Sequence, residues 1–241
     1  MKKLALVIPV YNEEGNIEKV INDWKNILSK KDFDIIVIND GSTDNTSVIL
    51  KKLKKQIKNI KILNKLNGGH GETIYLGYVY SIKNKYKFIF QVDSDDQFSS
   101  EDFRRIWRLR NKNYDLILGY RHNRKDPIIR LFLSKIVLRI FFLFYFNKNI
   151  TDANIPFRLI KKNFLEKFIK LSSNKYIAPN ILITLFSKKT LFIKVKHFQR
   201  SKGNINWPIK KLFNFGVKLI LEIVEWKNVI SKQFKKSQGN S

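Results

Sequence analysis

Five short apolar runs alternate with helical patterns in the first half of the chain, and this alternation leaves few folds open. The runs cover residues 4–10, 33–38, 60–63, 88–92 and 116–119. Continuous apolar runs of this length are typical of strands that are covered on both faces. Strands that alternate with helices form a mostly parallel sheet with right-handed connections. We therefore expect an α/β domain with a mostly parallel sheet and helices on both of its faces.

Polar loops follow four of these runs, at residues 11–14, 39–44, 67–71 and 93–97. In a parallel sheet, ligands bind outside the carboxyl ends of the strands. The four loops are therefore predicted to meet at one rim, which is the expected ligand site. In the third loop, Gly69 and Gly71 would let the backbone approach a ligand closely, although an ordinary helix-entry turn also uses glycine.

The loop after the fourth run is strongly acidic. Asp93, Asp95 and Asp96 occur close together, and Gln97 follows them. Carboxylates this close repel one another unless a cation neutralises them. Hard oxygen ligands suit Mg²⁺ or Mn²⁺, and these ions in turn suit a diphosphate. The other interpretation is a solvated turn in which an Asp caps the next helix.

The chain has a large basic excess. Its 241 residues include 47 Lys and Arg against 20 Asp and Glu, which gives a formal charge of +27. Such an excess indicates a polyanionic partner, namely a nucleic acid, an acidic membrane surface or a phosphorylated substrate. Because the rim loops are acidic and the chain has no recognised nucleic-acid motif, nucleic-acid binding is the less favoured alternative. The chain has no Cys, which excludes disulfides and thiolate metal sites.

Two later segments are amphipathic. Residues 127–146 are strongly apolar but include Arg130, Lys135 and Arg139, each of which would cost about 2.5–3.5 kcal/mol at a membrane centre. This segment is predicted to lie as a helix in the membrane interface, and a buried core helix is the alternative. Residues 208–234 are predicted to form a C-terminal amphipathic helix, and residues 235–241 a disordered tail. With no signal peptide and no transmembrane span predicted, we expect a cytoplasmic protein that is peripheral on the cytoplasmic face of the membrane.

Four short motifs resemble the successive signatures of family 2 glycosyltransferases. They are IPVYNEE at 8–14, NDGSTD at 39–44, NGGHG at 67–71 and DSD at 93–95. This resemblance extends to about Arg121 and implies the GT-A fold, a Rossmann-like fold of inverting enzymes that use nucleotide-sugar donors. Two later motifs, TDANIPFR at 151–158 and RSKG at 200–203, resemble the dolichyl-phosphate mannose synthase branch. In that branch the acceptor is a polyprenyl phosphate.

The resemblance implies a donor site and a metal site on the rim. The expected donor-binding residues include the two glycines of the third loop. They are Pro9, Tyr11, Glu13, Asn39, Asp40, Gly69, Gly71 and Asp93. Asp93 and Asp95 match the DxD pair, and Asp95 and Gln97 would hold Mg²⁺ or Mn²⁺, which would act as a Lewis acid on the departing diphosphate. Asn39 stands where an Asp is usual.

On the acceptor side, the resemblance implies four phosphate-binding residues, Arg121, Arg130, Ser134 and Arg200. Arg121 is also expected to be catalytic, together with Asp93 and Asp95, and arginine is well matched to phosphate geometry. Tyr120 stands where a Ser precedes this arginine in the family. A lipid phosphate is already ionised at neutral pH and needs no general base, whereas a sugar hydroxyl would need one, for which Asp152 or Asp96 is the candidate.

We therefore expect residues 1–121 to be the nucleotide-sugar-binding half of a GT-A domain and residues 122–207 its acceptor-side half. The predicted function is metal-dependent transfer of a sugar from a GDP- or UDP-sugar to a polyprenyl phosphate. The alternative is transfer to a saccharide hydroxyl in the synthesis of cell-surface polysaccharide. Since the transmembrane helices of some synthases are not found in this sequence, the amphipathic helices or a membrane partner subunit would provide the anchor.

Overall fold

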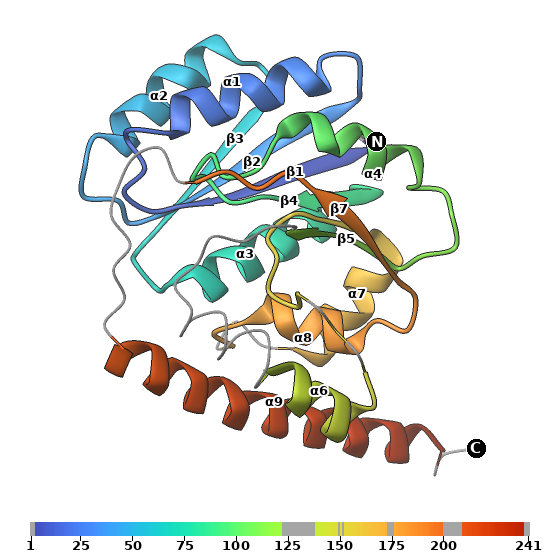
Figure 1. The fold of residues 1–241 in the computed structure, drawn as a ribbon. Coiled ribbons are helices and arrows are strands. Elements are labelled where there is room, and N and C mark those ends of the chain that lie inside the picture. Colours follow the sequence, from blue (N-terminus) through green and yellow to red (C-terminus); the bar gives the residue numbers. More distant parts are fainter. Residues whose placement is uncertain are drawn as a thin grey trace.

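The computed structural model describes residues 3–121, 138–148, 150, 152–172, 176–199 and 209–238. In these residues one seven-stranded sheet carries helices on both faces (Figure 1). The strands are β1 (Leu4–Val10), β2 (Phe33–Asp40), β3 (Ile60–Lys65), β4 (Phe88–Gln91), β5 (Leu116–Arg121), β6 (Arg158–Lys161) and β7 (Thr190–Val195). They are ordered β3-β2-β1-β4-β6-β5-β7, and only the two pairings of β6 are antiparallel. The predicted mostly parallel α/β sheet is confirmed.

The helices lie in two layers around this sheet and a further pair lies outside them. Figure 1 shows α1, α2 and α4 on one face and α3, α7 and α8 on the other. Their bounds are α1 (Ile17–Leu28), α2 (Thr46–Gln56), α3 (His70–Lys83), α4 (Phe103–Arg108), α7 (Lys162–Leu171) and α8 (Pro179–Phe186), with a 3₁₀ turn, η1 (Ser100–Asp102), before α4. The outer pair is α6 (Leu138–Phe146) and α9 (Ile209–Gln238).

The sheet is buried because its central strands are mostly apolar. Every residue of β1 and β2 is buried, as expected for strands that have helices on both sides. On one face, Trp24 of α1 packs on Phe90 of β4 with ring centroids 5.3 Å apart, and Phe157 lies 4.8 Å from Phe90. This aromatic cluster supports the start of the loop that carries Asp93.

Two strands from the second half of the chain complete the sheet. β6 lies between β4 and β5, with Arg158 opposite Gln91, and β7 pairs with the outer side of β5. The sequence did not predict these two strands. Since they bring the second half of the chain into the same sheet, the residues after 150 contribute directly to the surroundings of the acidic loop.

The outer helices contact one another beyond α8 (Figure 1). Lys227 of α9 donates a hydrogen bond to the carbonyl of Tyr145 at 2.9 Å, and its Nζ lies 3.7 Å from the centroid of the Tyr145 ring. The apolar segment predicted for 127–146 is described from residue 138 onward and is helical there. Within the described ranges, every helix is too short or too polar to cross a membrane.

The C-terminal helix is longer than expected. It was predicted to end at residue 234, before a disordered tail, but α9 continues to Gln238. The extra residues are polar but include no Gly or Pro, so nothing in them stops a helix. Lysines are also favourable at the carboxyl end of a helix, where they complement its dipole.

Candidate active site

The four predicted loops meet at the carboxyl end of the sheet, where hydrogen bonds connect the first three and a contact between His70 and Asp93 reaches the fourth. The first loop bonds to residues 42–45, and Asp40 bonds to the third loop. His70 of the third loop lies 3.6 Å from Asp93 of the fourth, measured from Nε2 to Oδ1. The prediction of a common rim is therefore confirmed.

The first loop turns sharply at Asn12, which has a positive φ of 52°. Asn adopts this left-handed conformation more readily than most residues. Asn12 Oδ1 accepts a hydrogen bond from the backbone N–H of Thr43 at 2.8 Å, and the Asn12 N–H donates to Ser42 Oγ at 3.0 Å. These bonds fix the first loop against the second.

The predicted donor residues of the first loop differ in exposure. Pro9 is buried within β1. Glu13 is also buried, and its carboxylate accepts a hydrogen bond from Asn16 Nδ2 at 2.8 Å. Tyr11 is 47% exposed, so among these three side chains it presents the most surface to a ligand.

The side chain of Asn39 makes four hydrogen bonds to the protein. Its Nδ2 donates to Ser47 Oγ at 2.9 Å and to Asn64 Oδ1 at 3.1 Å. Its Oδ1 accepts from the N–H and the hydroxyl of Ser42 at 3.2 and 2.6 Å. An ionised aspartate has no donor, so it could accept from the Ser47 hydroxyl but could not donate to Asn64 Oδ1. The presence of Asn in place of the usual Asp therefore fits its neighbour Asn64.

Asp40 holds the third loop in place. Its buried carboxylate accepts hydrogen bonds from Lys65 Nζ at 2.6 Å and from the N–H groups of Gly68 and Gly69 at 2.9 and 3.0 Å. Gly69 has a φ of +91°, which favours glycine, and a Cβ added there would meet nothing within 4 Å. Asp40 thus positions the glycine loop from inside the protein.

Gly71 has a packing role. A Cβ at this position would lie 2.5 Å from the carbonyl oxygen of Ile177 and 2.6 Å from that of Tyr176. The close approach that was predicted for this glycine is therefore made, in this structure, to the chain before α8. That segment is in turn held by Glu222 of α9, whose carboxylate accepts hydrogen bonds from the N–H groups of Ile177 and Ala178 at 2.7 and 3.2 Å.

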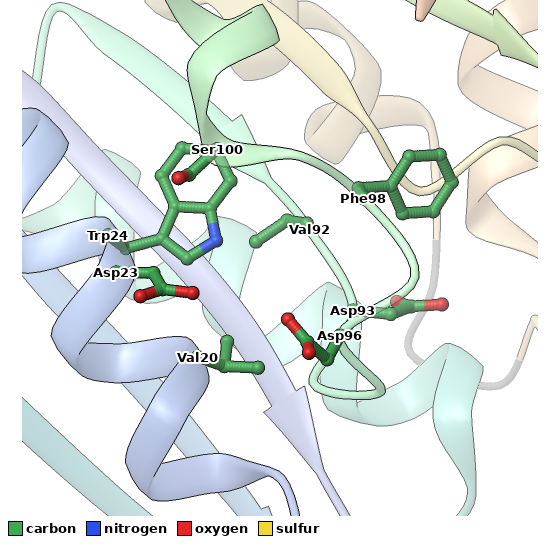
Figure 2. Close-up of a pocket in the computed structure, with 8 residues that line it drawn as sticks. All are labelled: Val20, Asp23, Trp24, Val92, Asp93, Asp96, Phe98 and Ser100. Atoms are coloured by element: carbon green, nitrogen blue, oxygen red, sulfur yellow. The ribbon is translucent and has the colours of Figure 1, made fainter. Parts of the chain in front are cut away.

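The acidic loop separates its three aspartates. Asp96 has a φ of +59°, and its carboxylate pairs with Lys19 of α1 at 2.8 Å. Figure 2 shows Asp93 and Asp96 on this loop, with Asp23 and Trp24 of α1 beside them. The pocket that these residues line has a volume of only about 10 Å³, which is room for about one water molecule. A donor nucleotide would therefore lie on the open rim, outside this pocket.

Asp93 has a carboxylate oxygen that is buried in the protein. This oxygen, Oδ1, has no hydrogen-bond partner among the described residues. Burial raises the pKa of Asp93, and the positive charges of His70, Arg158 and Arg121 oppose that rise. A buried carboxylate oxygen without a partner is the kind of atom that a bound cation would satisfy.

Gln97 ties the acidic loop to the chain after β7. Its side-chain Nε2 donates to the backbone carbonyl of Phe198 at 3.2 Å, and the backbone carbonyl of Gln97 accepts from the Phe198 N–H at 2.8 Å. The Gln97 N–H lies 3.3 Å from Asp95 Oδ1. The described residues contain no cluster of three His, Asp or Glu side chains able to hold a metal. Mg²⁺ often takes only one or two carboxylates and completes its shell with phosphates and water, so this donor set fits such an ion.

Arg121 and Asp152 form a nearly buried bidentate ion pair. Arg121 Nε lies 2.8 Å from Asp152 Oδ2, and Nη2 lies 2.9 Å from Oδ1. The side chains are only 14% and 10% exposed. Arg121, the predicted phosphate-binding arginine, is therefore paired with Asp152, the alternative general base. The other predicted phosphate ligands, Arg130, Ser134 and Arg200, lie outside the described residues.

Three basic side chains near the rim were not predicted: Lys19, Lys65 and Arg158. Lys65 lies in Lys-rich surroundings and Lys19 is one of several charged residues of an amphipathic helical pattern, so no local pattern distinguished them. Arg158 did leave a signal, because it is a single charge within the otherwise apolar stretch at residues 155–160. His70, to which the sequence assigned no role, lies beside Asp93.

Comparison with known proteins gives three findings. A family model described as glycosyl transferase family 2 matches residues 5–169. The undecaprenyl-phosphate 4-deoxy-4-formamido-L-arabinose transferase of Photorhabdus laumondii is 27% identical over 224 residues, which are 91% of this chain and 67% of that protein. An uncharacterized protein of Methanocaldococcus jannaschii is 34% identical over 194 residues, covering 77% of this chain and 82% of its own length.

Comparison with solved structures adds a finding on the fold. The glucosyl-3-phosphoglycerate synthase of Mycobacterium tuberculosis, solved with Mn²⁺, uridine diphosphate and glucosyl-3-phosphoglycerate, superposes with a TM-score of 0.63 at 14% identity. The superposition covers 93% of this chain and 80% of the synthase chain. This likeness confirms the expected GT-A fold.

Proposed function

Because the chain belongs to glycosyltransferase family 2, we propose that it transfers a sugar from a GDP- or UDP-sugar to a polyprenyl phosphate. The observation that carries this proposal is the similarity, over 91% of the chain, to a protein named as an undecaprenyl-phosphate sugar transferase. The residues of the rim provide a donor side, an acidic centre and a cationic acceptor side, and each supports one part of the reaction.

On the donor side, a pocket of about 280 Å³ adjoins the second loop. Leu50 and Ile62 contribute apolar lining, while Asn39, Ser47 and Asn64 contribute polar groups. Ligand pockets usually combine an apolar surface with a few placed polar groups. In this proposal the pocket takes the base of the donor. Pro9, Tyr11, Glu13 and Asp93 complete the donor site, and Asp40 acts indirectly by holding Gly69 and Gly71.

At the acidic centre, Asp95 and Gln97 would hold Mg²⁺ or Mn²⁺, with Asp93 beside them. When bound, the ion would neutralise charge on the departing diphosphate. The buried Oδ1 of Asp93, which accepts no hydrogen bond from the described residues, supports this assignment. The mycobacterial synthase of the same fold was crystallised with Mn²⁺ and uridine diphosphate. Lys19 keeps Asp96 paired on the α1 side, so Asp96 is not needed as a ligand.

On the acceptor side, the reaction brings two phosphate-bearing substrates together, so cations are needed more than a base. Arg121 is the described arginine that we assign to the acceptor phosphate, and Arg130, Ser134 and Arg200 are proposed as its companions. Asp152 holds the Arg121 fork in one orientation through two hydrogen bonds. A lipid phosphate is already ionised at neutral pH, so its oxygen can attack the sugar without proton removal. Residues 1–121 then form the donor half and residues 122–207 the acceptor half.

A lipid acceptor requires access to a membrane surface. The outer helices α6 and α9 expose Leu143, Phe144, Val217 and Leu221, with Phe144 84% exposed. Phe142 of α6 is buried, so this helix packs one side inward and presents the other. We assign these residues, with the +27 charge of the chain, to peripheral attachment at an anionic membrane.

The test is a transfer assay with the purified chain, Mg²⁺ or Mn²⁺, a panel of GDP- and UDP-sugars, and undecaprenyl or dolichyl phosphate. We expect sugar to appear on the lipid phosphate, and Asp95→Ala to lower kcat by about 10³-fold or more because a metal ligand is lost. Glu101→Gln is the matched control, since Glu101 forms a surface pair with Arg104 and both side chains are more than half exposed.

The outcomes separate the alternatives. Near-normal turnover by Asp95→Ala would contradict the assignment of the acidic centre. Transfer to saccharide hydroxyls with none to lipid phosphate would show that the acceptor is wrong while the family chemistry holds. If Glu101→Gln lowers turnover as strongly as Asp95→Ala does, the loss is a general effect of removing a negative charge.

A further inference from the structure

A fully buried arginine lies at the base of the acidic loop. Arg158 is the first residue of β6 and stands opposite Gln91 of β4, two residues before Asp93. It is 0% exposed and is the largest of the completely buried side chains in the described residues. Arginine is almost never buried to this extent unless its charge is compensated.

The compensation comes from backbone carbonyl groups. Arg158 Nη1 donates to the carbonyl of Asn180 at 2.8 Å, Nε to that of Ile155 at 3.0 Å, and Nη2 to that of Ala153 at 3.3 Å. Nη2 also bonds to the carbonyl of Ile155. All four bonds end on carbonyl oxygens, so the guanidinium group is compensated by peptide dipoles and by carboxylates farther away.

Those carboxylates are the acids of the site. Burial lowers the pKa of Arg158, and the negative charges of Asp93 and Asp152 are among the influences that oppose this. The opposing influence is mutual, since the charge of Arg158 also favours the ionised form of Asp93. A buried guanidinium remains protonated, so it supplies a fixed positive charge near both acids.

The bonded carbonyls show what Arg158 holds in place. Two belong to residues one and three positions after Asp152, and the third belongs to the first turn of α8. Two of the same carbonyl groups also contact Thr184 of α8. Its hydroxyl lies within hydrogen-bond distance of the Ala153 and Asn180 carbonyl oxygens, at 3.1 and 2.8 Å. Asp152 is thus the last residue before a clamped segment, and it is Asp152 that orients Arg121.

We propose that Arg158 is a positioning residue for sugar transfer: by clamping residues 153–155 to α8 it holds the Asp152–Arg121 pair at the rim. This inference rests on the proposed function, and it adds a residue that touches neither donor nor acceptor. Lysine would keep the charge of Arg158 but not the planar fork that reaches carbonyls in two segments.

The test compares Arg158→Lys, Asp152→Asn and the double variant in the full chain, assayed well below their melting temperatures. We expect Arg158→Lys to lower kcat by about 100-fold, the typical cost of a 1 Å misplacement, with donor KM changed less than about 3-fold. In the Asp152→Asn background the same change should lower kcat by less than about 3-fold, because both act through one unit.

Tyr86→Phe is the control for lost stability. Tyr86 donates a buried hydrogen bond to Asp34 at 2.6 Å, near the start of β2 and away from the rim. It should lower the melting temperature and leave kcat unchanged. The proposal is overturned if Arg158→Lys lowers kcat no more than this control, or if the effects of Arg158→Lys and Asp152→Asn simply multiply. If the wild-type chain transfers no sugar, the proposed function fails, and the clamp is then judged by the same cycle on melting temperatures, where additive shifts would overturn it.

Discussion

Asn39 and Asp40 are neighbours at the end of β2, and each is used by a different part of the rim. Successive side chains of a strand point to opposite faces. Asn39 accordingly bonds to Ser47 of α2, while Asp40 bonds to Lys65 and the glycine loop on the other side. At the scale of single residues, the sequence located the rim but did not distinguish side chains that would contact the donor from side chains that hold the loops.

Asp40→Asn tests the role of Asp40. This change removes the charge that pairs with Lys65 and replaces one acceptor oxygen by a donor that faces a backbone N–H. We expect a loss of roughly 1.5–3 kcal/mol in the free energy of unfolding, the usual value for hydrogen bonds to charged groups. Urea denaturation measures it. Glu72→Gln is the control, since Glu72 lies 3.6 Å from Lys65 and is 37% exposed, and an equal loss there would contradict the assignment.

Gly71→Ala and Gly216→Ala form a second residue-scale test. A Cβ at Gly71 would lie 2.5 Å from a backbone oxygen, whereas one at Gly216 of α9 would meet nothing within 4 Å. Gly71→Ala should therefore destabilise by about 1–3 kcal/mol through overpacking. Gly216→Ala should stabilise by up to about 1 kcal/mol, because alanine is the better helix former. Equal urea midpoints for the two variants would refute the packing role of Gly71.

At the scale of elements, the sequence predicted local features better than pairings between distant segments. The apolar runs of β1 and β2 gave their positions, because burial on both faces leaves a continuous apolar pattern. β6 is short, and its place between β4 and β5 depends on contacts with residues about 40 to 70 positions away, which no local pattern encodes. The burial of Arg158 follows from that pairing, so its position at the site became apparent only with the sheet complete.

The contact between α9 and α8 gives a prediction for pH. Burial raises the pKa of Glu222 above its usual value of 4.5, although the N–H groups of Ile177 and Ala178 oppose the rise. The folded chain then binds this proton more tightly than the unfolded chain does. The stability that protonated Glu222 contributes is present below about pH 4.5 and is lost as pH rises through the raised pKa.

Glu222→Gln removes this titration. We therefore expect the unfolding free energy of the wild type, relative to that of Glu222→Gln, to fall as pH is raised from about 4 towards 7. Urea denaturation of both chains across this range measures the difference. A difference that stays constant, or that moves the other way, would show that the pKa of the half-buried Glu222 is not raised.

At the scale of the whole molecule, helices α6 and α9, which carry exposed apolar side chains, lie on the opposite side from α1 and α2 (Figure 1). This arrangement allows a matched test of membrane attachment. Phe144→Asp should weaken co-sedimentation with vesicles of phosphatidylcholine and phosphatidylglycerol by about tenfold or more, given the free energy of burying a phenyl ring. Val48→Asp changes an apolar residue of α2 that is 64% exposed and should leave binding intact. Equal effects of the two changes would place the membrane contact elsewhere.

Trp226 of α9 lies 6.0 Å from the ring of Phe186 and 6.4 Å from that of Phe168, measured between centroids. Leu219 and Ile223 of the same helix are also buried. Shortening the chain before residue 209 to obtain a better-behaved sample would therefore uncover an aromatic layer and leave two peptide N–H groups without their carboxylate. In such a truncated sample the segment against which Gly71 packs would lose its support. Structural and enzymatic work is therefore better done on a chain that keeps this helix, with detergent added.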